Sequence, residues 1–183
     1  MTKRVHLIRH GQSLFNAAFA EARIDPMIFD APLSALGHQQ VATLCESVRE
    51  LAAEIVVTSP LTRAIQTTLG AFGFATAPVV VEALHRERVE HSCDVGRSPG
   101  ELAREFPGLA FGHLDDPWWH SDGSHPQAIV TEPEETLLSR VAAFRRWLSH
   151  RPEKNIAVVG HGTFLNRLTG RMFQNCELLT IEM

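Results

Sequence analysis

Residues 4–13 read RVHLIRHGQS, and residues 155–164 read NIAVVGHGTF. In each stretch a short apolar run is followed by a histidine and then a glycine, with His10 in the first stretch and His161 in the second. Continuous runs rich in valine and isoleucine are typical of strands that are covered on both faces of a parallel sheet. The two stretches therefore predict two buried strands, each ending at a histidine.

Two further apolar runs, residues 55–58 and 79–81, predict strands of the same kind. Stretches with a helical spacing of apolar residues lie between the four runs, and such alternation of strand and helix is typical of α/β proteins. We therefore expect residues 1–183 to form one domain, a three-layer α/β sandwich with a largely parallel central sheet and helices on both faces.

Capping signals mark where the helices are expected to begin. A serine side chain accepts hydrogen bonds from amides of the first helical turn, and proline is favoured at the first helical position. For the longest helix, Thr131 and Glu134 are expected to form a capping box. The expected helices run from Ser34 to about residue 51, from Ser59 to about Phe72, from Ser98 to near Pro107, from Glu134 to His150, and onward from Gly162.

Two stretches show no regular period. Residues 15–32 give mixed signals, and residues 111–130 are rich in Asp, His, Trp, Gly and Pro. Long irregular segments in a compact domain are usually functional or disordered, and Trp118 and Trp119 favour ordered packing here. We expect residues 96–130 to form a loop-rich cover over the functional site.

The composition is that of a globular protein and argues against several classes of partner. Hydrophobic residues make up 44% of the chain, and its net charge of −4 offers no general attraction to nucleic acid or to an anionic membrane. No apolar run approaches the ~18 residues of a membrane span. Three widely spaced cysteines favour neither a disulfide framework nor a CxxC metal site, so a reducing cytoplasm is expected.

Basic and imidazole side chains gather where the predicted strands end. His10 and His161 follow two strands directly, and Arg9 adjoins the first of them. Arg63 lies near the start of the helix that follows residues 55–58. Ligands of open α/β sheets bind at the carboxyl ends of the strands, and both helix N-termini and arginine side chains favour phosphate. The pattern predicts a site for a phosphoryl group.

Four elements occur in a fixed order along the chain: Arg9-His10-Gly11, Asn16, the run from Ser59 to Ala64, and Gly160-His161-Gly162. Together they resemble the histidine phosphatase (phosphoglycerate mutase-like) superfamily, and the resemblance spans most of the chain. It implies a phosphoglycerate mutase-like fold and a phosphoryl transfer that needs neither a metal nor a cofactor.

The resemblance also implies roles for single residues. It implies that His10 is the nucleophile and becomes a phosphohistidine. It also implies that Arg9, Arg63 and the catalytic His161 bind the oxygens of the phosphoryl group. Asn16 is expected to add a neutral hydrogen bond to the same group. Two arginines and a histidine can stabilise a transferring phosphoryl group by positioning and charge.

A leaving alkoxide also needs a proton. The family places an acidic residue after its third strand, and Glu87, directly after Arg86, stands at the matching place. Glu87 is expected to act as the general acid and later to activate water. Many relatives have a glycine a few residues beyond their acid, whereas His91-Ser92-Cys93 intervenes here, so Glu90 and Glu82 stay open as alternatives.

We expect a phosphomonoester hydrolase that acts through a phosphohistidine on a small phosphorylated substrate. The alternatives are a phosphoglycerate mutase-type phosphotransferase and a catalytically weak binding protein of the same fold. Mutases of this family generally have longer chains, and this chain ends at Met183, soon after His161, which favours water as the acceptor. The substrate and the oligomeric state stay open.

Two other groups of residues invite a different interpretation. Cys93 near Glu87 could be a nucleophile, but a packed thiol is the better interpretation. One loop carries residue types that bind divalent metals, but no helical or hairpin spacing aims them at one point, so no metal site is expected. These residues are His113, Asp115, Asp116, His120, Asp122 and His125.

Overall fold

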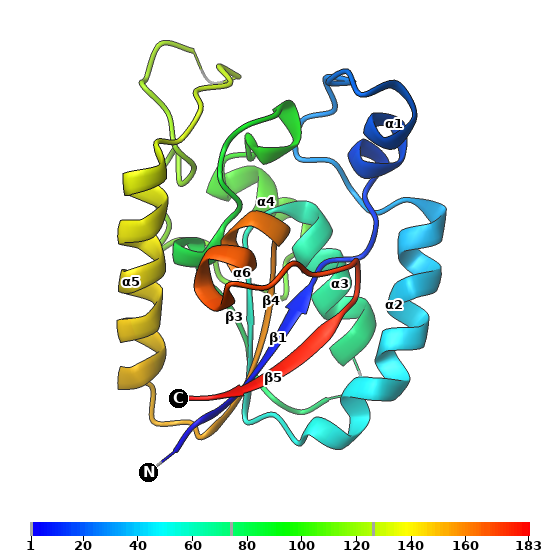
Figure 1. Cartoon of the computed structure of the whole chain (residues 1–183), viewed down its shortest axis with the longest axis vertical. Coiled ribbons are helices and arrows are strands. Elements are labelled where there is room, and N and C mark those ends of the chain that lie inside the picture. The colour runs from blue at the N-terminus through cyan, green and yellow to red at the C-terminus, as the bar shows by residue number, and fades with distance from the viewer. Residues whose placement is uncertain (1, 74, 126) are drawn as a thin grey trace.

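The computed structural model describes residues 2–73, 75–125 and 127–183. At its centre lies a five-stranded sheet with the strand order β3-β2-β4-β1-β5 (Figure 1). β5 runs antiparallel to β1, and the other pairs are parallel. This confirms the predicted α/β class with a largely parallel sheet. The strands are β1 (Arg4–Arg9), β2 (Ile55–Thr58), β3 (Val79–Val81), β4 (Asn155–Gly160) and β5 (Leu178–Glu182).

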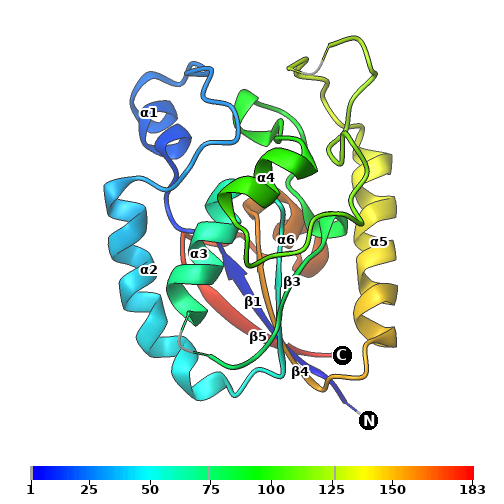
Figure 2. The ribbon, with the colours of Figure 1, turned by 180° about the vertical axis from the view of Figure 1, so that it is seen from behind.

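Helices cover both faces of the sheet, as Figures 1 and 2 show from opposite sides. Successive side chains of a strand point to opposite faces. Val5 and Leu7 of β1 pack in a core with α5 and α6, whereas Ile8 packs in a second core with α2 and α3. The helices are α1 (Leu14–Ala22), α2 (Ala35–Val48), α3 (Thr62–Phe72), α4 (Pro99–Glu105), α5 (Glu134–His150) and α6 (Gly162–Thr169), with short 3₁₀ turns η1 (Arg49–Leu51), η2 (Ala83–His85) and η3 (Ser92–Asp94).

Two of the predicted capping signals are confirmed. The side chain of Ser34 accepts a hydrogen bond from the amide of Gly37 at the start of α2. Ser98 and Glu101 form a reciprocal capping box at the start of α4. Each pairing lies within four residues of sequence, which is why the local pattern suffices to predict it.

Two other predicted caps are wrong. α5 begins after Pro133 with no side-chain cap, so Thr131 and Glu134 form no capping box. α3 begins at Thr62 rather than at Ser59, and its first amide donates instead to Asp30 Oδ1 at 2.8 Å. The Asp30 carboxylate comes from a distant loop, so a local pattern could not reveal it.

In the described part of the segment 96–130, α4 is followed by irregular chain in which aromatic side chains are packed. Trp118 Nε1–H donates to the carbonyl oxygen of Arg97 at 2.8 Å. The Trp118 ring lies so close to Gly96 that a Cβ there would come within 2.1 Å of it, which explains the glycine. Trp118 and Trp119 are both buried, so the expected ordered packing is confirmed for these two side chains.

Candidate active site

The register of the sheet brings three strand ends to one edge. Arg9, the last residue of β1, lies opposite Gly160, the last residue of β4, and β2 pairs with the other side of β4. His10, His161 and Ser59 directly follow these three strands. Residues that are far apart in sequence therefore meet at the carboxyl ends of neighbouring strands, as predicted.

His10 is buried, and its contacts define its tautomer. Nδ1 lies 2.7 Å from the carbonyl oxygen of Gly11, which can only accept, so Nδ1 carries the proton. Arg63 Nε–H donates to Nε2 at 3.2 Å. Burial, and then the charges of Arg63 and Arg9, lower the pKa of His10 well below 6.5. The ring is therefore neutral at pH 7, with an unprotonated Nε2.

His161 is fully buried beside His10, with the two ring centroids 5.1 Å apart. Its Nε2 lies 2.8 Å from Ser59 Oγ, which also accepts from the Leu61 amide at 3.4 Å. Burial, and then the charges of Arg63 and His10, lower the pKa of His161 well below 6.5. Nδ1 has no partner among the described residues, and it carries the proton of the neutral ring in the tautomer in which the Ser59 hydroxyl donates to Nε2.

Arg9 adds a second donor that lacks an acceptor. Its Nη1–H donates to the carbonyl oxygen of Phe173 at 2.6 Å, whereas its buried Nε has no partner in the described part of the chain. Gly162 lets α6 approach closely, since a Cβ there would lie 3.3 Å from the guanidinium carbon of Arg9. Buried N–H groups without acceptors are costly, so Arg9 Nε and His161 Nδ1 suit the oxygens of an anion.

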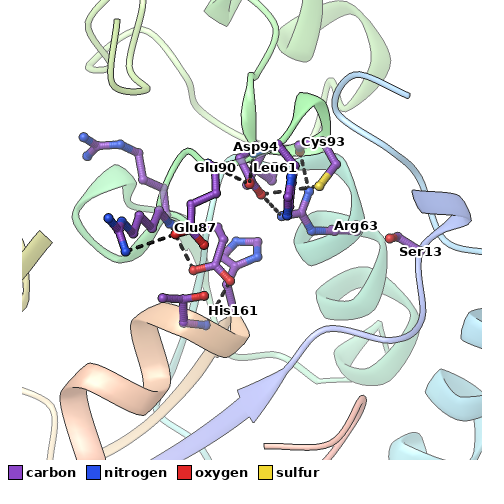
Figure 3. A network of polar contacts seen from close by, with 12 residues as sticks. Ser13, Leu61, Arg63, Glu87, Glu90, Cys93, Asp94 and His161 are labelled. Atoms are coloured by element: carbon purple, nitrogen blue, oxygen red, sulfur yellow. Dashed lines mark hydrogen bonds and ion pairs between the residues drawn. The ribbon is translucent and has the colours of Figure 1, made fainter. Parts of the chain in front are cut away.

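Arg63 is held by a network that Figure 3 shows from close by. Besides the bond to His10, its Nη1–H donates to the carbonyl oxygen of Cys93 at 2.6 Å, and its Nη2–H donates to Asp94 Oδ1 at 2.9 Å. Asp94 was missed by the sequence analysis. The one hint in the sequence near Asp94 was the run His91-Ser92-Cys93, which stands where many relatives have a glycine.

Glu87 lies beside His161 (Figure 3) and caps α6. One of its carboxylate oxygens accepts from the amide of Thr163 and the other from that of Phe164, both at 3.0 Å. Burial, and then the Asp94 carboxylate, raise the pKa of Glu87 above 4.5. A carboxyl group with a raised pKa is suited to donating a proton near pH 7.

The two alternative acids face elsewhere. The Glu90 carboxylate is 40% exposed and pairs with Arg88 at 3.0 Å. Glu82 Oε1 accepts from the amide of Leu84 at 2.9 Å and thereby caps η2. The geometry therefore favours Glu87 among the three candidates.

Asn16 takes part in a contact that the sequence analysis did not foresee. Its side-chain oxygen accepts from the backbone amide of Ser13 at 3.2 Å, and the backbone amide of Asn16 donates to Ser13 Oγ at 3.1 Å. This reciprocal pair is the capping box of α1, which begins the stretch that gave mixed signals. The contact of Asn16 with a phosphoryl group stays a prediction.

The loop considered for metal binding and the buried thiol of Cys93 were the two other candidate sites in the sequence. Across residues 2–73, 75–125 and 127–183, no three His, Cys, Asp or Glu side chains are grouped to hold a metal ion. His113 Nε2 lies 2.9 Å from the carbonyl oxygen of Val81. Cys93 is buried, and that burial raises the pKa of its thiol, as expected for a packed cysteine.

A cavity of about 720 Å³ lies between the start of α4 and the segment that follows it. Phe29, Arg97 and Trp119 are among the residues that line it. Arg97 Nη2–H donates to the hydroxyl of Thr62 at 2.6 Å, and Thr62 directly precedes Arg63. Arg97 thus connects the cavity wall to the N-terminus of α3, whereas His10, Arg63 and His161 are not among the residues that line the cavity.

Comparison with known proteins identifies relatives over almost the whole chain. The family model of the histidine phosphatase superfamily (branch 1) matches residues 5–180. A phosphoglycerate mutase-like protein of Arabidopsis thaliana is 30% identical, covering 95% of this chain and 76% of the relative. A glucosyl-3-phosphoglycerate phosphatase of Mycolicibacterium vanbaalenii is 25% identical, covering 93% and 74%.

Solved structures share the fold. The alpha-ribazole phosphatase of Shigella flexneri superposes with a TM-score of 0.67 at 21% identity, covering 97% of this chain and 89% of that one. A mycobacterial glucosyl-3-phosphoglycerate phosphatase gives a TM-score of 0.65 at 18% identity, covering 100% and 91%. In the part of the chain that the structure describes, no helix is both long enough and apolar enough to cross a membrane.

Proposed function

The chain belongs to the histidine phosphatase superfamily, and from this we propose that it hydrolyses small phosphate monoesters through a phosphohistidine at His10, without a metal or cofactor. The observation that carries the proposal is the buried, unprotonated Nε2 of His10. Arg9, Arg63 and His161 surround it with N–H donors, which suit the oxygens of a phosphoryl group.

In the first step, the Arg63 Nε–H bond to His10 Nε2 opens, and the freed lone pair of Nε2 attacks phosphorus in line with the ester oxygen. The N–P bond forms as the P–O bond to the leaving group breaks, and the protonated Glu87 carboxyl gives its proton to the departing oxygen. Arg9, Arg63 and His161 Nδ1–H stabilise the charge on the three remaining oxygens. The alcohol departs, and Glu87 is left as a carboxylate.

In the second step, water attacks the phosphohistidine. The Glu87 carboxylate takes a proton from the water as its oxygen bonds to phosphorus and the N–P bond breaks. Inorganic phosphate leaves, Glu87 is protonated again, and the lone pair returns to His10 Nε2. The Gly11 carbonyl keeps the His10 proton on Nδ1 throughout both steps.

The cavity lined by Phe29, Trp119 and Arg97 is the candidate place for the rest of the substrate, although it has no lining residue in common with the phosphoryl site. Residues 96–130 would cover the bound molecule there, as expected from the sequence. The location proposed for the protein is a reducing cytoplasm, which would suit its three free cysteines, Cys45, Cys93 and Cys176. Cavity and cover together favour an organic phosphate small enough to be enclosed.

Chelation tests the proposed independence from metals. We expect the purified protein to release phosphate from an aryl phosphate at the same rate before and after dialysis against EDTA, because the donors at the site are N–H groups of the chain. The measurement is initial phosphate release, with a zinc-dependent phosphatase as the positive control. Loss of activity that zinc or magnesium restores would contradict the metal-free mechanism.

The group that accepts the phosphoryl group distinguishes a phosphatase, which uses water, from a mutase. The distinction matters here because two relatives are named phosphoglycerate mutase-like proteins. We expect phosphate release from at least one monoester of a metabolite panel to exceed the interconversion of phosphoglycerates. Both rates are measured on one preparation, by phosphate detection and by phosphorus NMR. Rapid interconversion with negligible release would identify a phosphotransferase, and neither activity would favour a binding protein.

A further inference from the structure

We propose that Asp94 is a positioning residue that fixes the guanidinium group of Arg63 against His10. The inference rests on the proposed function and adds to it a carboxylate that does not itself touch the substrate. Asp94 Oδ1 accepts from Arg63 Nη2–H at 2.9 Å, and the two side chains are 5% and 3% exposed. A carboxylate this buried beside an arginine holds the cation in one place.

The Asp94 carboxylate is itself held rigidly. Its second oxygen, Oδ2, accepts from the amides of Glu90 at 3.2 Å and His91 at 3.1 Å. The two oxygens therefore act separately, since Oδ2 closes the η3 turn while Oδ1 reaches out to Arg63. Figure 3 shows Asp94 beside the guanidinium group of Arg63.

The η3 turn is anchored from its outer side by another carboxylate. Asp25 accepts from the amide of Ser92 at 2.8 Å and from its hydroxyl at 2.6 Å. The Cys93 carbonyl on the same turn accepts from Arg63 Nη1–H at 2.6 Å. The turn therefore presents two acceptors to Arg63 as one unit, and Asp25 steadies that unit without contacting the arginine.

This arrangement leaves Arg63 prepared for a ligand. An arginine has five N–H bonds, and the contacts with His10, Cys93 and Asp94 use three of them. Two remain for phosphoryl oxygens, in a direction set before the substrate arrives. Donors that need no reorganisation during the reaction stabilise the transition state most effectively.

Asp94 also influences Glu87 through its charge. Among the described residues, four charged groups act on the Glu87 carboxylate: Asp94 raises its pKa, while Arg63, Arg9 and Arg167 favour the ionised form. Removing the Asp94 charge lowers the pKa of Glu87. The proton-donating form of Glu87 is then lost at a lower pH, which gives a signature that a loss of stability alone would not produce.

The test begins with Asp94→Asn. An asparagine has one acceptor oxygen, so it can satisfy either the two turn amides or Arg63, but not both. We expect kcat/KM on an aryl phosphate to fall roughly 10–100-fold, as for a misplaced catalytic group, and inhibition by inorganic phosphate to weaken. With an alkyl phosphate, the alkaline limb of the kcat/KM profile moves to lower pH.

Two comparisons make the test decisive. Asp25→Asn loosens the same turn but leaves both acceptors for Arg63 on it, so it should lower kcat/KM and weaken phosphate inhibition less than Asp94→Asn does. With an aryl phosphate, which leaves without the Glu87 proton, adding Asp94→Asn to an Arg63→Ala variant should cause little further loss in kcat/KM, because the positioning effect of Asp94 acts through Arg63. Asp94→Glu keeps the charge but displaces it, and it should also lower kcat/KM.

Three results would overturn the inference: wild-type kinetics in Asp94→Asn, equal losses in Asp25→Asn and Asp94→Asn, or full additivity with Arg63→Ala. If Asp94→Asn does not fold, Asp94→Glu decides the question in its place. The proposed function fails separately, since it predicts phosphate release by the unaltered protein, which does not depend on any Asp94 variant.

Discussion

His10→Ala is expected to abolish turnover while leaving the fold intact. The substitution removes the nitrogen that bonds to phosphorus, and a lost nucleophile costs roughly 10⁶-fold in kcat at a comparable covalent site. The measurement is phosphate release at high enzyme concentration, with circular dichroism and thermal melting to establish that the variant is folded.

His6, a histidine within β1, serves as the control. His6 is also buried, but its ring contacts Thr180 Oγ1 at 2.8 Å and Asn155 Oδ1 at 2.6 Å, and it lies in the middle of β1 rather than after its end. His6→Asn should keep wild-type turnover below its melting transition. Substantial activity in His10→Ala, or equal losses in both variants, would contradict a nucleophilic role for His10.

Glu87→Gln is expected to slow alkyl phosphates by about 10²–10⁴-fold and aryl phosphates far less in the first step. An alkoxide must be protonated as it leaves, whereas a nitrophenolate departs without a proton, and glutamine cannot supply one. The matched control is Glu90→Gln, since the Glu90 carboxylate pairs with Arg88 rather than facing His161. Leaving-group dependence in Glu90→Gln instead would assign the acid to Glu90.

The same variant predicts a change in pH dependence. Because the pKa of Glu87 is raised above 4.5, the protonated acid persists to higher pH, and kcat/KM for alkyl phosphates falls as pH rises through the Glu87 pKa. The acidic limb belongs to His10, whose pKa is well below 6.5, so the nucleophile stays neutral on mild acidification. Glu87→Gln should remove the alkaline limb and keep the acidic one.

The strands and most helices could be predicted because their signals are local. The runs 55–58 and 79–81 form strands with the bounds that their apolar character predicts. β5 was missed because it is an edge strand with half-exposed residues and no continuous apolar run. α1 was missed because its capping partners, Ser13 and Asn16, lie beside a stretch of mixed polarity.

The site shows the same division between local and distant signals. His10 and His161 can be recognised in the sequence because each follows an apolar run, and the register of the sheet then brings them together. Asp94 gives no such signal, because its importance lies in a contact with Arg63, 31 residues away in sequence. The start of α3 was misplaced for the same reason, since its capping group is Asp30 on another loop. Contacts of this kind arise only from the folded chain.

Trapping the phosphoenzyme tests the central claim most directly. Glu87→Gln should be mixed with an excess of aryl phosphate and quenched in alkali, where a phosphohistidine survives, because the variant lacks the base that activates water and the intermediate should accumulate. We predict a single acid-labile phosphoryl group, located on His10 by mass spectrometry and on its Nε2 by NMR, since Nδ1 is bonded to the Gly11 carbonyl. Steady release of phosphate with no phosphohistidine, or with phosphate on another residue, would contradict the covalent mechanism.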